Sequence, residues 1–149
     1  MMVLMVLRAT ALAAVLVLPP TLAFAQAGVI AERQAGFRML RDRMEAIQTI
    51  VQMRDPNSEA VPHARAIAEH APKIKTLFPP GSDGQGSRAL PAIWTDRAGF
   101  ERVADAFVQR AEALLAAAQG NDQRALAQAF EATGQACGAC HRPYRQPQR

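Results

Sequence analysis

The sequence lacks several patterns that would place it in other classes of protein. No window shows the alternation of apolar and polar residues that indicates a β-strand, so no sheet is predicted. Beyond the N-terminus, no apolar segment reaches the length of about 20 residues that crosses a membrane. The basic residues form no concentrated stripe, so the charge pattern gives no support for nucleic-acid binding.

Cysteine and histidine are also scarce, with two and three copies in 149 residues. Both cysteines and one histidine fall in a single stretch, Cys137-Gly138-Ala139-Cys140-His141. This spacing is the attachment signature of c-type haem, in which each thiol adds to a vinyl group and the adjacent imidazole binds the iron. On a helix, positions i, i+3 and i+4 share one face, and the two small residues leave room for a flat macrocycle. We therefore predict one covalently attached haem c per chain.

Other roles for this stretch fit less well. A thioredoxin-like redox pair belongs near a βαβ pattern, and none surrounds the motif. A zinc site needs more ligands nearby, whereas the remaining histidines, His63 and His70, lie far upstream. A disulfide between the two cysteines would close a very tight loop.

The first 25 residues are typical of a secretory signal peptide. Arg8 precedes a largely apolar run from Ala9 to Leu18, two prolines follow, and Ala23-Phe24-Ala25 fits the cleavage pattern. The alternative is a membrane anchor, but the run is about half of the 20 residues or so that a span needs. We predict export to the periplasm, no stable membrane insertion after cleavage, and a mature domain of residues 26–149 that carries net charge +3, because cleavage removes only one basic residue.

Apolar periodicity predicts four helices in the mature chain. The first runs from Gly28 to Arg54 and carries a heptad seam, formed by Ile30, Arg33, Phe37, Leu40, Met44, Ile47 and Val51. The second begins near Glu59 to Pro62, ends at about Leu77, and should kink or split at Pro72. The lone histidines on this helix are interpreted as partly exposed side chains.

Residues 78–91 are rich in proline, glycine and serine and are long enough to cross from one end of a bundle to the other. We expect Trp94 to pin this connection to the core, with contact to the haem edge as an alternative. Thr95 or Asp96 caps a third helix that runs to about Ala118. Asn121 or Asp122 caps the fourth, which carries the haem motif. The prediction is an all-α antiparallel four-helix bundle with haem on its C-terminal helix.

The position of the motif near the C-terminus, with no methionine after His141, resembles the class II cytochromes c, and in particular the cytochrome c′ family. Three further stretches match the family: Arg33-Gln34 followed by Phe37, then Pro91-Ala92-Ile93-Trp94, and Cys140-His141-x-x-Tyr144-Arg145. The resemblance implies thioether anchors at Cys137 and Cys140 and an axial ligand at His141. It also implies that Arg33 lies by a haem propionate, that Phe37 covers the distal face of the iron, and that Arg145 lies near the proximal imidazole.

Simpler roles exist for three of these residues. Arg33 can be a seam residue whose charged end extends to solvent, and Arg145 can be a cation that the helix dipole favours at a helix C-terminus. Phe37 can simply pack in the core, which is compatible with covering haem. Pro143 departs from the polar residue expected in the family ending and can alter the helix end before Arg145.

Two functions follow from the resemblance. The first is a five-coordinate haem protein that binds nitric oxide or carbon monoxide. The second is a six-coordinate electron carrier that serves periplasmic redox proteins, with Met44 or Met39 as the sixth ligand. An enzyme such as a peroxidase is a weaker alternative, because the seam offers no evident acid–base group. The resemblance also implies a homodimer that pairs through the first two helices.

Overall fold

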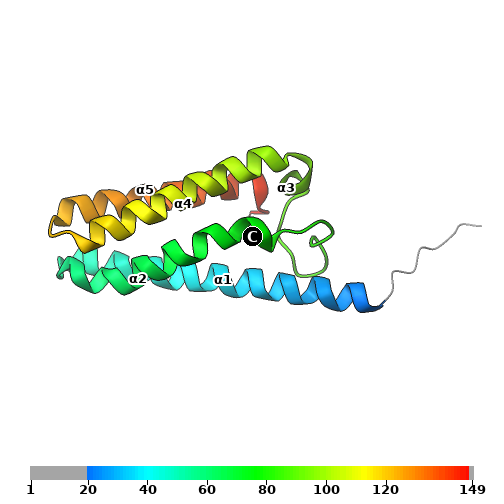
Figure 1. Ribbon diagram of the computed structural model, residues 1–149, viewed down its shortest axis with the longest axis horizontal. Coiled ribbons are helices and arrows are strands. Elements are labelled where there is room, and N and C mark those ends of the chain that lie inside the picture. Colours follow the sequence, from blue (N-terminus) through cyan, green and yellow to red (C-terminus); the bar gives the residue numbers. More distant parts are fainter. Residues whose placement is uncertain (1–19, 148–149) are drawn as a thin grey trace, which may run out of the picture.

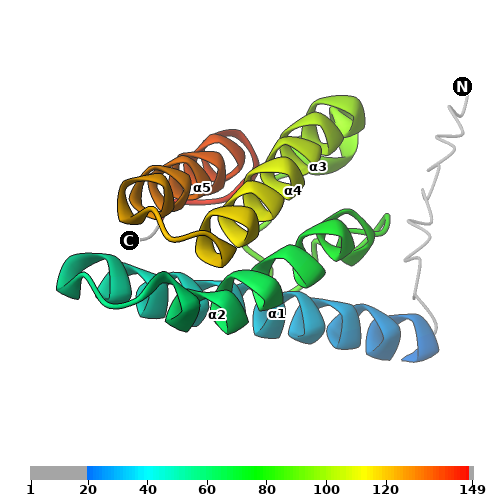
Figure 2. The same ribbon diagram turned by 60° about the vertical axis from the view of Figure 1, so that its left-hand side comes forward.

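Four long helices form an antiparallel bundle in the computed structural model, which describes residues 20–147 (Figure 1). They are α1 (Pro20–Met53), α2 (Asn57–His70), α4 (Arg97–Gln119) and α5 (Gln123–Tyr144). A 3₁₀ helix, η1 (Ala71–Leu77), continues α2, and the short α3 (Ala92–Thr95) precedes α4. Each helix packs against the next in the chain and α5 returns to α1, so that α1–α2 and α4–α5 form two pairs (Figure 2). The predicted all-α bundle is confirmed.

The helix ends follow from local sequence. Asp96 accepts a hydrogen bond from the amide of Gly99 at the start of α4, and Asp122 accepts from two amides at the start of α5. Both predicted caps are therefore confirmed. After α1, Arg54 takes a left-handed conformation with φ of 58°. Its amide and the next one bond back to the carbonyls of Val51 and Ile50, which ends the helix as a Schellman motif.

The second helix divides at the predicted proline. Regular α-helix ends at His70, and Pro72 lies in the first turn of η1. Proline has no N–H to donate to the preceding turn, so the tighter 3₁₀ geometry takes over. The inner face of α2 and η1 buries three alanines and two isoleucines, and the alanines let it lie close to α4; these residues are Ala60, Ala64, Ile67, Ala71 and Ile74.

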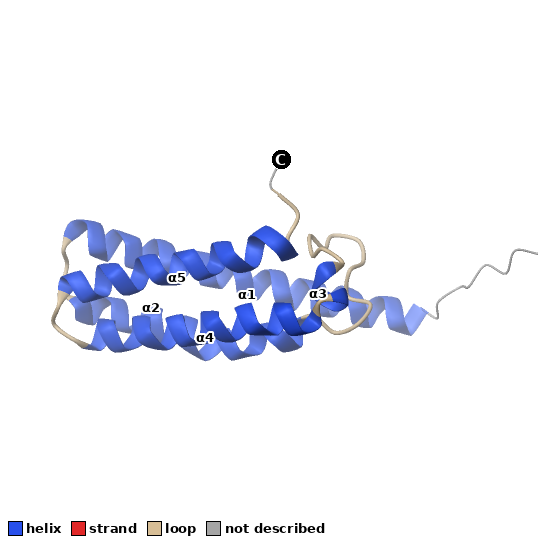
Figure 3. Ribbon diagram, turned by 90° about the horizontal axis from the view of Figure 1, so that it is seen from above, coloured by secondary structure: helices blue, strands red, loops and turns tan. Residues whose placement is uncertain are grey.

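Two predictions about the chain path need correction. Helix α1 already includes Pro20, eight residues before the predicted start at Gly28. Of the predicted signal peptide, residues 1–19 lie outside the described residues, and residues 20–25 continue the helix. The 78–91 loop stays at one end of the bundle, because η1 ends and α3 begins at that same end (Figure 3). Its length serves to cover this end and does not span the bundle.

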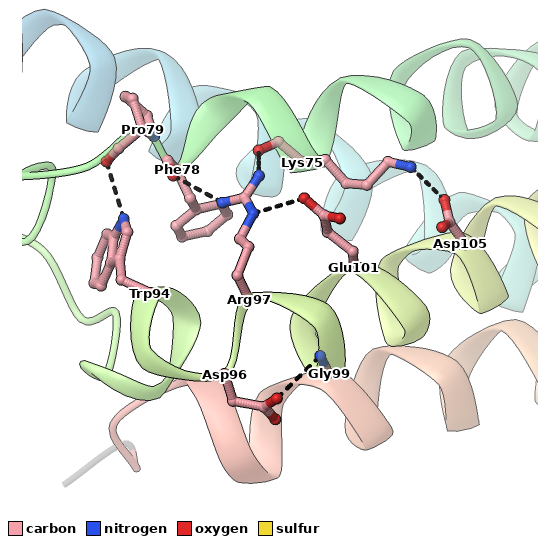
Figure 4. A network of polar contacts seen from close by, with 9 residues as sticks. All are labelled: Lys75, Phe78, Pro79, Trp94, Asp96, Arg97, Gly99, Glu101 and Asp105. Atoms are coloured by element: carbon pink, nitrogen blue, oxygen red, sulfur yellow. Dashed lines mark hydrogen bonds and ion pairs between the residues drawn. The ribbon is translucent and has the colours of Figure 1, made fainter.

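Side chains of α3 and α4 fasten the start of the 78–91 loop (Figure 4). The indole of Trp94 donates to the carbonyl of Pro79 at 3.0 Å. The guanidinium of Arg97 donates to the carbonyls of Phe78 and Lys75 at 3.0 and 2.8 Å. The predicted role of Trp94 as a pin for this connection is confirmed. None of the helices described between residues 20 and 147 combines the length and apolar character that a membrane span requires.

The start of α4 is joined to the end of α5 through one carboxylate. Asp96 uses Oδ1 to cap Gly99, and its Oδ2 accepts the hydroxyl of Tyr144 at 2.9 Å. Tyr144 is 6% exposed, and its ring stands edge-on to Phe100. Gly99 has to be glycine here, because a Cβ would collide with both the carboxylate and the hydroxyl.

We expect Gly99→Ala to lower the free energy of unfolding by about 1–3 kcal/mol, since overpacking would disrupt a cap and a buried hydrogen bond together. Gly28→Ala is the matched control, because a Cβ there meets no atom within 4 Å. Denaturant unfolding of the haem-loaded proteins measures both. Equal stability of the two variants would contradict the close approach at Gly99.

Candidate cofactor site

A cavity of about 620 Å³ lies between α1, α4 and α5. This volume is within the range of small-molecule and cofactor sites. Its walls are mostly apolar. The α4 wall contains Phe100, Val103, Ala104 and Phe107, and the 78–91 loop adds Ser87, Arg88 and Ala89.

Helix α5 brings the three residues of the haem motif to this cavity. Cys137, Cys140 and His141 all line it, and all three are half-buried. The expectation that they share one helix face is confirmed. Both cysteines are free thiols in the structure, which gives no support to the tight disulfide considered from sequence.

The same face of α5 has room for a flat group. Gly134, one turn before the motif, lines the cavity, and a Cβ there would meet no atom within 4 Å. The expectation that Gly138 and Ala139 leave room for the macrocycle is not supported, because neither residue lines the cavity, and a Cβ at Gly138 would first meet a terminal nitrogen of Arg142, at 3.4 Å. Two thiols, an imidazole and an unobstructed apolar space beside them fit a covalently held haem.

The cavity favours the neutral form of each of the three groups. Burial raises the pKa of Cys137, and burial together with the neighbouring thiol raises the pKa of Cys140 to about 11. Burial, assisted by the charge of Arg145, lowers the pKa of His141. A neutral imidazole is the form that binds a metal ion. Among the described residues, no group of three or more His, Cys, Asp or Glu side chains could hold a metal ion without a cofactor.

Phe37 reaches the cavity from α1, on the other side from the motif. Its ring centroid lies 6.4 Å from that of His141, and the two rings meet edge to face at 71°. It also contacts Phe78, at 6.3 Å. The structure thus brings together the residue expected on the distal side and the residue expected to bind the iron.

Arg33 and Arg145 also line the cavity. Arg33 is only 4% exposed, so the alternative that its charged end extends to solvent was wrong. Arg145 follows the last turn of α5 in an extended conformation, and Pro143 fits inside that turn without ending the helix. The amide of Arg145 donates to the carbonyl of His141 at 3.0 Å, and after burial the charge of Arg145 is the second cause that lowers the pKa of His141. The position of Arg145 after the helix end is equally compatible with the simpler dipole role.

Known proteins resemble the chain over most of its length. The family model described as Cytochrome C′ matches residues 28–145. The chain belongs to the cytochrome c′ family.

Haem c is therefore its cofactor, and the chain is a c-type haem protein. Cytochrome c′ of Rhodopseudomonas palustris is 33% identical over 146 residues, which cover 95% of this chain and 97% of that protein. Cytochrome c-556 of Agrobacterium tumefaciens (strain II Chrys) is 34% identical over 121 residues, which cover 80% of this chain and 98% of that protein.

Solved structures agree with the family assignment. Cytochrome c′ from Thermochromatium tepidum superposes with a TM-score of 0.78 at 28% identity, covering 82% of this chain and 97% of that one. A nitric oxide complex of a variant cytochrome c′ from Alcaligenes xylosoxidans gives a TM-score of 0.75 at 26% identity, with the same two coverages, 82% and 97%. A carbon monoxide complex of another cytochrome c′ variant from that organism also gives a TM-score of 0.75.

Several residues of the cavity were not predicted from the sequence. Ser87, Arg88 and Ala89 belong to an irregular loop, where periodicity gives no signal. Ala104 was missed because alanine adds little to an apolar pattern, although it sits one turn after Phe100. Trp94 does not line the cavity, so the alternative of haem-edge contact receives no support.

We expect the denatured protein, produced with a cytochrome c maturation system, to carry one haem per chain in its intact mass. The reason is that both thiols line the cavity beside the imidazole. A double variant, Cys137→Ser with Cys140→Ser, should release all haem into acid-acetone, whereas wild type should retain it. Complete extraction of haem from wild type would refute covalent attachment at this motif.

Proposed function

We propose that Cys137 and Cys140 hold the haem through thioethers and that His141 is its only protein ligand to iron. The half-buried positions of all three on one wall of the cavity support these roles. Bound haem supplies an iron atom that takes a diatomic gas or exchanges an electron. The remaining lining residues, which are mostly apolar, exclude water and restrict access.

The observation that carries the proposal is the pairing of Phe37 with His141 across the cavity, at 6.4 Å. A phenyl ring has no lone pair to donate to iron. It can only restrict the space on that side. A small neutral gas has to displace the ring, which favours nitric oxide and carbon monoxide over anions.

Methionines on α1 are poorly placed to act as a sixth ligand. Met44 lines the cavity but follows Phe37 by seven residues, about 10 Å along the helix. Met39 packs against the core and is not among the residues that line the cavity. Met53 is 69% exposed. The electron-carrier alternative therefore depends on Met44 and on a shift of α1 by about two turns.

Gas binding has support from similar proteins, since variants of cytochrome c′ from Alcaligenes xylosoxidans have been solved with nitric oxide and with carbon monoxide. We propose binding of such gases, with electron exchange with periplasmic redox proteins as a second role, and no enzymatic turnover.

Export to the periplasm remains our proposal and rests on the signal-like residues 1–25. The intact mass that reports haem attachment also reports the first residue, which should be Gln26 or close to it in material from the native host. Homodimer formation has support from a similar cytochrome c′ structure described as showing ligand-controlled dimer dissociation. Sedimentation of the haem-loaded protein, with and without carbon monoxide, tests it, and a single monomeric species throughout would reject it.

Phe37→Ala should speed carbon monoxide association with the ferrous protein by at least about tenfold, which corresponds to removing about 1.4 kcal/mol of barrier. Phe130→Ala is the matched control, because Phe130 also lines the cavity but comes from α5 and makes no ring contact with His141. Flash photolysis measures both rates. If the two variants bind carbon monoxide equally fast, Phe37 is not the gate.

A further inference from the structure

Arg33 lies on α1 one turn before Phe37, and both terminal nitrogens of its guanidinium donate hydrogen bonds to the loop region opposite. One terminal nitrogen donates to the carbonyl of Leu77 at 3.3 Å and the hydroxyl of Ser82 at 3.2 Å. The other donates to the carbonyl of Ser82 at 2.8 Å and the hydroxyl of Ser87 at 2.9 Å. Four hydrogen bonds thus join one side chain of α1 to the end of η1 and to both halves of the 78–91 loop.

These bonds involve both terminal nitrogens of the guanidinium. The ring of Phe78 covers one face of the guanidinium, with 4.3 Å between Cζ and the ring centroid. Ser82 is 1% exposed. If Arg33 were removed, the hydroxyl and carbonyl oxygens of Ser82 would lose their donor and could not bond to water instead.

The end of the 78–91 loop is bonded in turn to the segment that follows the haem motif. The amide of Leu90 donates to the carbonyl of Tyr144 at 3.0 Å, and the amide of Gln146 donates to the carbonyl of Arg88 at 2.9 Å. These two bonds flank Arg145, which pairs with Ala89 as an isolated antiparallel bridge. The loop therefore connects the helix that carries Phe37 with Arg145, whose amide donates to the carbonyl of His141 at 3.0 Å.

We propose that Arg33 is a positioning residue, which clamps the 78–91 loop to α1 and through that loop holds Arg145 beside His141. The clamp itself is independent of the proposed iron coordination; only its effect on the haem rests on the proposed function.

Hydrogen exchange of the haem-loaded protein tests the clamp directly. In Arg33→Lys and in Arg33→Gln, the amides of Leu90 and Gln146 should exchange at least about tenfold faster than in wild type, because neither side chain supplies the planar fork. Ser87→Ala, which removes one acceptor, should act in the same direction with a smaller effect. Arg41→Lys is the control, since Arg41 is exposed and paired with Asp42. In this variant the amides of Leu90 and Gln146 should exchange at the wild-type rate. Full protection of both amides in Arg33→Lys would overturn the clamp.

A double-mutant cycle on the reduction potential tests whether Arg33 acts through Arg145. Arg33→Lys and Arg145→Ala should each shift the potential, and the double variant should show the shift of Arg145→Ala alone. A double variant whose shift equals the sum of the two single shifts would overturn the route through Arg145. The exchange result does not depend on the number of iron ligands, so a failure of the clamp is distinguishable from a failure of the proposed gas-binding function.

Discussion

A flat cofactor bonded to one helix requires the helix opposite to stand away from it. Helix α5 carries Cys137, Cys140 and His141, and α1 is the helix that stands away from it. Contacts between the other helices compensate for this gap, because α2 and α4 bury residues of their inner faces completely, as at Ile67 and Leu114. At the cavity end, Tyr144 and Asp96 join α5 to α4 by a hydrogen bond, so the opening between α1 and α5 is kept without loosening the other helix pairs.

The same cavity decides the chemistry that is available. Its apolar walls disfavour charge, which lowers the pKa of His141 and raises the pKa of the thiols of Cys137 and Cys140. On the other side, Phe37 offers volume but no electron pair. The site that we propose, with His141 as its one ligand and Phe37 as an inert neighbour, would suit a small gas molecule that arrives from solution. An electron carrier gains from two fixed ligands, and the nearest methionine in the cavity, Met44, lies about two helical turns from Phe37.

Local sequence signals predicted much of this arrangement. The C-x-x-C-H spacing, the aspartate caps and the proline at position 72 each act within a few residues, so their outcome can be predicted without knowledge of the fold. The seam of α1 predicted correctly that Arg33 and Phe37 share a face. What Arg33 bonds to could not be predicted, because its partners are 44 to 54 residues away in a loop with no periodic pattern. The path of that loop depends on which end of the bundle it joins, and composition alone does not specify that.

The number of protein ligands on the iron is the central claim. Electronic absorption and electron paramagnetic resonance spectra of the wild-type haem-loaded protein, recorded in the ferric and ferrous states at neutral pH, measure it most directly. We predict high-spin, five-coordinate spectra in both states, with His141 as the only protein ligand. A low-spin ferrous spectrum with a methionine–iron signature would contradict the account and would assign the sixth position to Met44.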